Sequence, residues 1–158
     1  MLTAKQNMIE CITPGGKPDR FVNNFEALQF VMCPYLLSGN MLLNKGDMNV
    51  VNSWGVTYSF PENTPGQFPV HTPDKIVVKD IENWRDYVKG PSLEAPKELW
   101  DACMGMYEAV DQTKAFATPI KVSGLFEQSH HLCEITNALT YYIEYEDEMH
   151  DLITYLMD

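Results

Sequence analysis

The sequence predicts an α/β fold, because strands and helices alternate along the second half of the chain. Residues 96–112 form the best-defined predicted helix, in which Pro96 suits the first helical position. A strand is predicted over 116–122 and a second long helix over 125–142. Strands that alternate with helices at this spacing are typical of a parallel sheet. The apolar stripe of the 96–112 helix consists of Leu99, Cys103, Met106 and Val110, widened by Trp100 and Tyr107.

The first half of the chain carries shorter signals. Thr3 and Gln6 have the spacing of a capping box at the start of a helix over 3–12, which Pro14-Gly15-Gly16 ends. Composition assigns the following segments: a strand over 21–32, one or two strands over 48–60, a proline-rich loop over 61–73, an extended stretch over 75–79 and a helical turn over 81–88.

The last residues predict an amphipathic helix with an acidic first turn at 146–148, where the helix dipole favours negative charge. Its apolar stripe consists of Met149, Leu152, Ile153, Leu156 and Met157. The sequence contains no helix-stop signal after this stripe. We therefore expect the chain to be the first part of a longer protein. The alternative is a C-terminal helix that docks on the residues before it.

Composition limits the classes of partner and compartment. The chain of 158 residues has a net charge of −11 and a pI of about 4.6, so nucleic acid and anionic membranes are not expected partners. It has no apolar run of the ~20 residues that a membrane span needs, and no signal peptide. The scattered cysteines predict free thiols in a reducing cytoplasm: Cys11, Cys33, Cys103 and Cys133.

Local motifs for nucleotide, phosphate or metal chemistry are absent from the sequence. His131-Leu132-Cys133 has one ligand-like spacing, but zinc needs three or four ligands and no second pair is nearby. On a helix, residues i and i+2 also point about 200° apart. We therefore predict no metal site and no cofactor within this chain.

Five residues are candidates for a functional site. His130 and His131 follow a strand-to-helix turn and could donate a proton or a hydrogen bond; the alternative is an exposed pair without a role. Asn24 and Glu26 fall at the end of the first predicted strand, where parallel α/β folds carry their sites; the alternative is a solvated strand end. Trp54 could form a pocket wall, or belong to the core.

Five short segments carry a resemblance to a known family. They are Gly15 to Arg20 (Gly-Gly-Lys-Pro-Asp-Arg), Asn52 to Val56 (Asn-Ser-Trp-Gly-Val), Ile81 to Val88 followed by Pro91, Val122 to Glu127, and Glu146 to Leu152. In this order they resemble segments of the uroporphyrinogen decarboxylase superfamily. The counterparts there are the turn before the first strand, the Asp/Asn-x-Trp-Gly segment, the segment before the long helix, the Gly-Pro-Phe-type turn and the Pro-Glu-x-x-His-x-Leu helix start.

The resemblance implies a partial (β/α)8 TIM barrel with an N-terminal helical extension. Such barrels need ~250 residues, so residues 1–158 would be the N-terminal part of one barrel. This is the main reason for expecting a fragment. A partial barrel exposes strand edges and would be marginal alone or need a partner, such as a second copy in a homodimer.

The family contains decarboxylases, which act on a tetrapyrrole with eight carboxylates, and cobalamin-dependent methyltransferases. Alignment places the decarboxylase arginines within 23–28, which contains none, and the decarboxylase aspartate near Asn52-Ser53, where there is no acid. The active-site tyrosine falls at or next to His131. An anionic substrate needs cationic partners, so these departures favour methyl transfer from a small methylated donor.

In this interpretation Glu26 or His131 orients the donor or acceptor, as the catalytic residues, and Asn24, Trp54 and His130 bind the small-molecule substrate. The family's zinc ligands would lie beyond Asp158, so zinc and a corrinoid protein partner are implied only for a longer protein. Two alternatives stay open. One is a uroporphyrinogen decarboxylase that recruits arginines from elsewhere, and the other is a non-catalytic half-barrel that binds a small ligand or a corrinoid partner.

Overall fold

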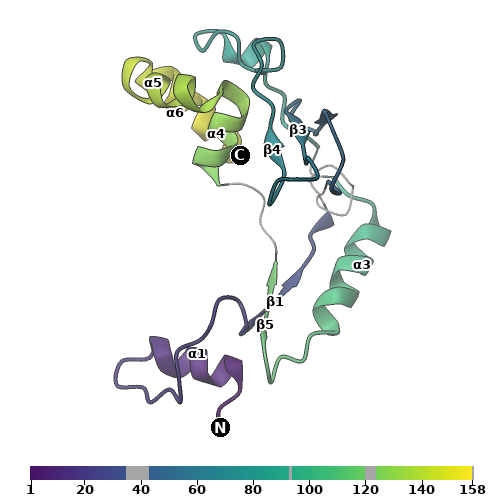
Figure 1. The fold of residues 1–158 in the computed structure, drawn as a ribbon, viewed down its shortest axis with the longest axis vertical. Helices are drawn as coiled ribbons and strands as arrows, with labels where there is room; N and C mark the ends of the chain where they lie inside the picture. Colours follow the sequence, from purple (N-terminus) through teal and green to yellow (C-terminus); the bar gives the residue numbers. More distant parts are fainter. Residues whose placement is uncertain (35–42, 93, 120–123, 158) are drawn as a thin grey trace. The chain divides into compact units, whose positions relative to one another are not determined.

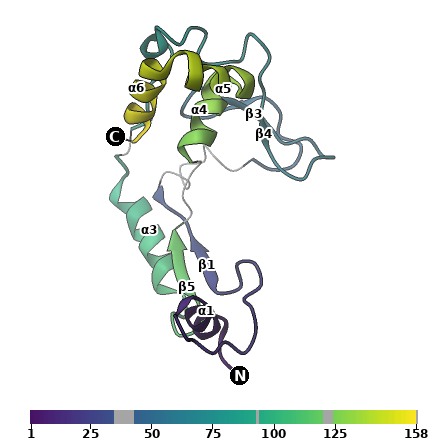
Figure 2. The same ribbon diagram turned by 90° about the vertical axis from the view of Figure 1, so that its left-hand side faces the viewer.

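The computed structural model describes residues 1–34, 43–92, 94–119 and 124–157, and the chain divides into two compact units (Figures 1 and 2). Unit 1 comprises Met1–Ser38 and Glu94–Lys121, and unit 2 comprises Gly39–Leu93 and Val122–Asp158. Each unit therefore combines two separate stretches of sequence. Helices and strands are mixed, as predicted for an α/β protein, and both sheets in the described residues are small and open.

Unit 1 begins with α1 (Ala4–Ile12), and its predicted capping box is confirmed. The Gln6 backbone N–H donates to Thr3 Oγ1 (3.2 Å), and the Thr3 backbone N–H donates to Gln6 Oε1 (3.0 Å). Each side chain thus binds a backbone donor that the first helical turn leaves unpaired. The Lys5 side chain connects the helix to the second stretch of the unit, because its Nζ lies 4.5 Å from the centre of the Phe116 ring.

The sheet of unit 1 is a parallel pair. Strand β1 (Leu28–Val31) pairs with β5 (Phe116–Pro119), with Leu28 opposite Phe116 and Val31 opposite Pro119. Helix α3 (Lys97–Glu108) precedes β5 in the sequence and packs against β1 (Figure 1). Two parallel strands need a crossover connection of this kind.

The helix predicted over 96–112 ends at Glu108, and its predicted stripe is confirmed for Cys103, which is buried, and for Leu99 and Met106, which are partly buried. Val110 is also buried but follows the helix. The predicted widening of the stripe is wrong: Trp100 is 52% exposed and Tyr107 is 41% exposed. The face that contacts β1 is therefore narrower than the spacing of apolar residues indicates.

The first predicted strand was placed too early in the sequence. Residues 24–27 form a turn, and β1 begins only at Leu28. Asn24 has a φ of 45°, a left-handed conformation that asparagine tolerates better than most residues. Asn24 and Glu26 consequently precede β1, at its amino end, instead of following its carboxyl end.

Unit 2 contains an antiparallel sheet in the order β2-β3-β4. Its strands are β2 (Val50–Val51), β3 (Thr57–Ser59) and β4 (Phe68–Pro69). The prediction of up to two strands over 48–60 is thus confirmed, and the proline-rich loop contributes a short third strand. Pro69 fits there because β4 is at the edge of the sheet, where a missing N–H costs no ladder bond.

The helices of unit 2 follow one another closely: α4 (Leu125–Cys133), α5 (Ile135–Glu144) and α6 (Glu146–Met157). The single helix predicted over 125–142 is therefore wrong. Glu134 breaks it with a φ of 72°, and its carboxylate accepts the backbone N–H groups of Thr136 (3.0 Å) and Asn137 (3.1 Å). No helix in the described ranges is long and apolar enough to cross a membrane.

The carbonyl groups at the end of α4 are bound by other parts of unit 2. The backbone N–H groups of Val77 and Val78 both donate to the Leu132 carbonyl (3.1 and 3.0 Å). The Asn137 side chain donates to the Cys133 carbonyl (3.0 Å). The extended stretch predicted over 75–79 therefore joins no sheet and instead closes the end of a helix.

One hydrophobic cluster holds unit 2 together. Its buried members are Val56, Tyr58, Val78, Ile81, Trp84, Val88, Leu132, Cys133, Ala138, Met149 and Leu152. Met149 and Leu152 are the buried face of α6, and both Figures 1 and 2 show α6 beside α4 and α5. Two residues of the predicted apolar stripe are thus docked on the residues before the last helix, whereas Met157 is 61% exposed.

Candidate functional site

The predicted site residues are divided between the two units. Asn24 and Glu26 lie in unit 1, while Trp54, His130 and His131 lie in unit 2. In unit 2 the structure adds a tyrosine and a third histidine that sequence reasoning did not single out.

The best-defined polar contact of unit 2 joins β3 to α4. Tyr58 comes from β3 and is buried, and His131 comes from the last turn of α4. The Tyr58 hydroxyl oxygen lies 2.8 Å from His131 Nδ1, and the two rings meet edge to face with centroids 5.6 Å apart. This distance and the buried position of Tyr58 indicate a strong, fixed hydrogen bond.

Two further histidines surround His131. The ring of His130 lies 4.4 Å from that of His131, between centroids, and is nearly perpendicular to it. His71, which follows β4, donates from Nε2 to the backbone carbonyl of His131 (3.0 Å). We call Tyr58, His71, His130 and His131 the histidine cluster. Among the described residues, no group of three His, Cys, Asp or Glu side chains could hold a metal ion.

Burial favours the uncharged form of two imidazoles in the histidine cluster, those of His130 and His131. Burial lowers the pKa of His131 to about 4, helped by the neighbouring His130 and His71 and opposed by Glu127. Burial also lowers the pKa of His130, followed by the influence of His71. Within the described part of the chain, His130 Nδ1 is buried without a hydrogen-bond partner. His131 and His130 therefore offer uncharged imidazole donors and acceptors.

The spacing of His131-Leu132-Cys133 has a structural explanation. Leu132 and Cys133 are both fully buried members of the hydrophobic cluster. Burial raises the pKa of Cys133 to about 12, so its sulfur is a thiol at neutral pH. Metal ligation and nucleophilic attack both require the thiolate.

Trp54 lies in the turn between β2 and β3. Asn52 Oδ1 shapes this turn by accepting the backbone N–H groups of Trp54 (3.0 Å) and Val56 (2.9 Å). The indole is partly buried and packs against the hydrophobic cluster. The structure thus gives Trp54 a packing role, which was the alternative interpretation, and a contact with substrate stays a prediction.

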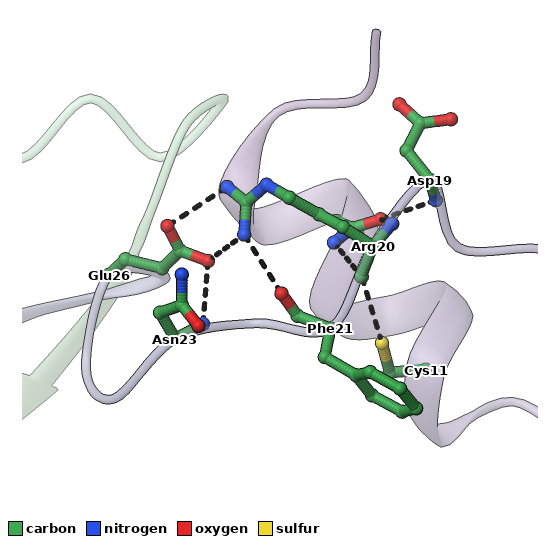
Figure 3. A network of polar contacts seen from close by, with 7 residues as sticks. Cys11, Asp19, Arg20, Phe21, Asn23 and Glu26 are labelled. Atoms are coloured by element: carbon green, nitrogen blue, oxygen red, sulfur yellow. Dashed lines mark hydrogen bonds and ion pairs between the residues drawn. The ribbon is translucent and has the colours of Figure 1, made fainter.

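In unit 1, Glu26 is the centre of a polar network with Arg20 (Figure 3). Arg20 Nη2 donates to Glu26 Oε2 (2.9 Å), Nη1 binds Oε1, and the Asn23 backbone N–H donates to Oε1 (2.8 Å). The hydrogen bond from Arg20, followed by that from Asn23, lowers the pKa of Glu26. Glu26 is therefore an ionised carboxylate whose two oxygens are both engaged.

Asn7 supports this network from α1. The side chain is buried, its Oδ1 accepts the Asp19 backbone N–H (2.7 Å), and its Nδ2 donates to the Arg20 carbonyl. The segment that leads into β1 is thus fixed to the first helix before Glu26 is reached.

The structure removes the positional argument for Asn24 and Glu26. In parallel α/β folds, sites form at the carboxyl ends of strands, and these residues lie at the amino end of β1. The carboxyl ends of β1 and β5 lead towards residues 35–42 and 120–123, which are outside the described ranges. A catalytic role for Glu26 and a binding role for Asn24 remain predictions without structural support.

Sequence reasoning missed Tyr58 and His71. Tyr58 and His131 are 73 residues apart, and no local pattern links them. Comparisons of the chain with family models, curated proteins and solved structures find no match.

Proposed function

We propose that the chain is the N-terminal part of an enzyme of the uroporphyrinogen decarboxylase superfamily, from the branch that transfers methyl groups. In this proposal β1 and β5 are the first two strands of a (β/α)8 barrel. Their parallel pairing, the crossover that contains α3 and the helices that follow β5 support it. The five family-like segments, which extend from Gly15 to Leu152 in the family's order, support it independently.

The observation that carries the choice of methyl transfer concerns arginine. The sequence contains two arginines, and each is hydrogen-bonded to a carboxylate of the chain itself. Arg20 binds Glu26, and Arg85 Nη2 lies 2.7 and 2.9 Å from the two oxygens of Asp151. A tetrapyrrole with eight carboxylates would need arginine side chains to bind its carboxylates. A small methylated donor does not need these cationic partners.

The histidine cluster supplies the proposed role of His131. A neutral imidazole held by Tyr58 can orient a donor or acceptor molecule through a hydrogen bond. In the proposal His130 and Trp54 line the substrate site. The proposed roles of Asn24 and Glu26 have less support, because both residues lie at the amino end of β1. The described residues do not fit a zinc site. In the proposal, zinc and a corrinoid partner are implied only for a longer protein.

The test is a methyl-transfer assay with the product of the complete coding sequence. Two half-reactions are followed separately: cob(I)alamin with small methylated donors, and methylcobalamin with a thiol acceptor. The visible spectrum of the corrinoid reports the gain of a methyl group in the first and its loss in the second. We expect His131→Ala to lower turnover roughly tenfold or more, a loss of ~1.4 kcal/mol of transition-state stabilisation. His150→Ala is the matched control, because His150 is exposed on α6 and should leave turnover unchanged.

Decarboxylation and a non-catalytic half-barrel, the two alternative functions, can each be tested by a separate measurement. Loss of carbon dioxide from uroporphyrinogen, followed by mass spectrometry, would establish decarboxylation and overturn methyl transfer. If neither reaction occurs and light scattering finds a stable dimer, the non-catalytic half-barrel is favoured. Unchanged turnover in both His131→Ala and Glu26→Ala would remove the site assignment.

A further inference from the structure

We propose that Tyr58 is a positioning residue that holds His131 in the neutral tautomer with its proton on Nε2. His131 would then present Nε2–H as a hydrogen-bond donor to an acceptor atom of the bound molecule. The role towards a bound molecule rests on the proposed function, whereas the tautomer itself does not. The inference adds a residue and a direction of hydrogen bonding to the site of unit 2.

The geometry fixes which atoms share the proton. The Tyr58 oxygen and His131 Nδ1 are 2.8 Å apart, so one of them donates to the other. A phenol O–H is a stronger acid than the N–H of a neutral imidazole, and the bare ring nitrogen is the stronger base. The arrangement O–H···Nδ1 is therefore favoured, and it leaves the imidazole proton on Nε2.

The packing around Tyr58 makes this arrangement durable. Tyr58 lies on β3 between neighbours on both sides, and its side chain is 4% exposed. On the other side, α4 is held at its end by His71, which donates to the His131 carbonyl, and by Val77 and Val78, which donate to the Leu132 carbonyl. Tyr58 therefore cannot turn away from the hydrogen bond without disrupting the core.

Nε2 of His131 then determines which kind of ligand atom the site can bind. Within the described residues, Nε2 has no hydrogen-bond partner. The titratable neighbours of the ring are His71, His130 and Glu127, and burial keeps His131 uncharged. A neutral N–H donor selects an oxygen or nitrogen acceptor and does not require a negative charge. This suits a methylated oxygen or nitrogen compound.

The tautomer can be measured directly by nitrogen-15 NMR of the histidine side chains in the 158-residue protein near neutral pH. A His131→Gln variant identifies the His131 signals among those of the four histidines. We expect His131 to show a protonated Nε2 and an unprotonated, hydrogen-bonded Nδ1. A spectrum with the proton on Nδ1 would overturn the proposal, and this result needs no Tyr58 variant to fold.

A pair of tyrosine variants tests the cause. Tyr58→Phe removes only the hydroxyl, so we expect the Nδ1 signal of His131 to move and a measurable share of the other tautomer to form. Tyr155→Phe is the matched control, because its hydroxyl accepts the Gly90 N–H (2.7 Å) elsewhere in unit 2. If Tyr58→Phe leaves the His131 signals unchanged, Tyr58 does not position it.

The outcomes separate the two proposals. The tautomer is measured without substrate, so it can be confirmed even if the enzyme transfers no methyl group. Conversely, methyl transfer that depends on His131 but not on Tyr58 would keep the proposed function and remove the positioning role.

Discussion

His131 makes the stability of the protein depend on pH. Burial lowers its pKa from 6.5 to about 4 in the folded chain, so between these values the unfolded chain binds a proton that the folded chain does not. The free energy of unfolding should therefore fall as the pH decreases through this window. The whole pKa shift corresponds to ~3 kcal/mol. Because the ring is partly exposed to solvent, we expect the free energy of unfolding to fall by roughly 2 kcal/mol.

Urea denaturation at about pH 7 and about pH 5 measures this dependence. His131→Gln should weaken the fall in stability between the two conditions, because the variant cannot take up the proton. His150→Gln, at an exposed site on α6, should retain the fall. Equal pH dependence in the two variants would contradict a buried neutral His131.

Asn7 is a second residue whose side chain holds distant backbone groups. It is 1% exposed and binds the Asp19 N–H and the Arg20 carbonyl, which precede the first strand. Asn7→Ala leaves these groups without partners and should lower the free energy of unfolding by roughly 1–2 kcal/mol. Gln29→Ala, at an exposed position of β1, should have little effect in the same thermal or chemical unfolding experiment. Equal losses would contradict the anchoring role.

At the scale of elements, sequence patterns correctly predicted the features that depend on neighbouring residues. The capping box at Thr3 and Gln6 closes within four residues, and the α3 stripe needs only one side of a helix to be covered. Residues 75–79 join no sheet in the described chain, and Val77 and Val78 donate instead to a carbonyl more than fifty residues away in the sequence. Composition cannot foresee such a partner.

The break between α4 and α5 was missed because glutamate is not a usual helix cap. Ser, Thr, Asp and Asn are the residues that signal a helix start, whereas Glu134 caps α5 with a longer side chain. Its φ of 72° and ψ of 149° belong to a region that is almost restricted to glycine. The capping bonds and the packing of unit 2 therefore hold a strained residue in place.

Two substitutions at Glu134 separate strain from capping. Glu134→Ala and Glu134→Gly both remove the carboxylate that accepts the Thr136 and Asn137 N–H groups. Only glycine also removes the strain, so Glu134→Gly should be more stable than Glu134→Ala by about 1 kcal/mol. Chemical denaturation compares the two variants directly. An alanine variant that equals or exceeds the glycine variant in stability would show that the backbone at this position is not strained.

The candidate site shows the same division between local and distant signals. His130 and His131 were singled out correctly as neighbours on a helix, but Tyr58 and His71 come from the sheet of unit 2 and carry no signal in the sequence. The apolar residues before Leu28 predict a strand, and this prediction puts Glu26 at the wrong end of β1. These residues are a turn that the Glu26 and Arg20 pair stabilises.

At the scale of the whole molecule, the chain forms each unit from two separate segments. Residues Gly39–Leu93 are inserted between β1 and α3, and their core is completed by Val122–Asp158. Composition and periodicity describe segments one at a time, so they predicted an α/β protein without revealing this division. Helix α6 illustrates the consequence, because its Tyr155 ring lies 5.2 Å, between centroids, from that of Trp84, which precedes the helix by more than sixty residues.

The two units should differ in local stability. Among the described residues, the hydrophobic cluster of unit 2 contains eleven buried side chains, whereas unit 1 buries four hydrophobic ones, Ala27, Val31, Cys103 and Val110. Since protection from hydrogen exchange follows the buried apolar contacts that opening must break, unit 1 should open at a lower free energy.

Hydrogen–deuterium exchange with mass spectrometry tests this difference in the intact chain. Peptides from β1 and β5 should exchange faster than peptides from α4 and α6, although both sets include backbone-bonded amides. Leu132→Ala provides the control, because Leu132 is fully buried and its truncation should cost about 2–5 kcal/mol. It should accelerate exchange in α4 and α6 far more than in β1 and β5. Equal protection of both units, or equal acceleration by the variant, would show that they unfold as one cooperative body, since their amides would then report a single opening reaction.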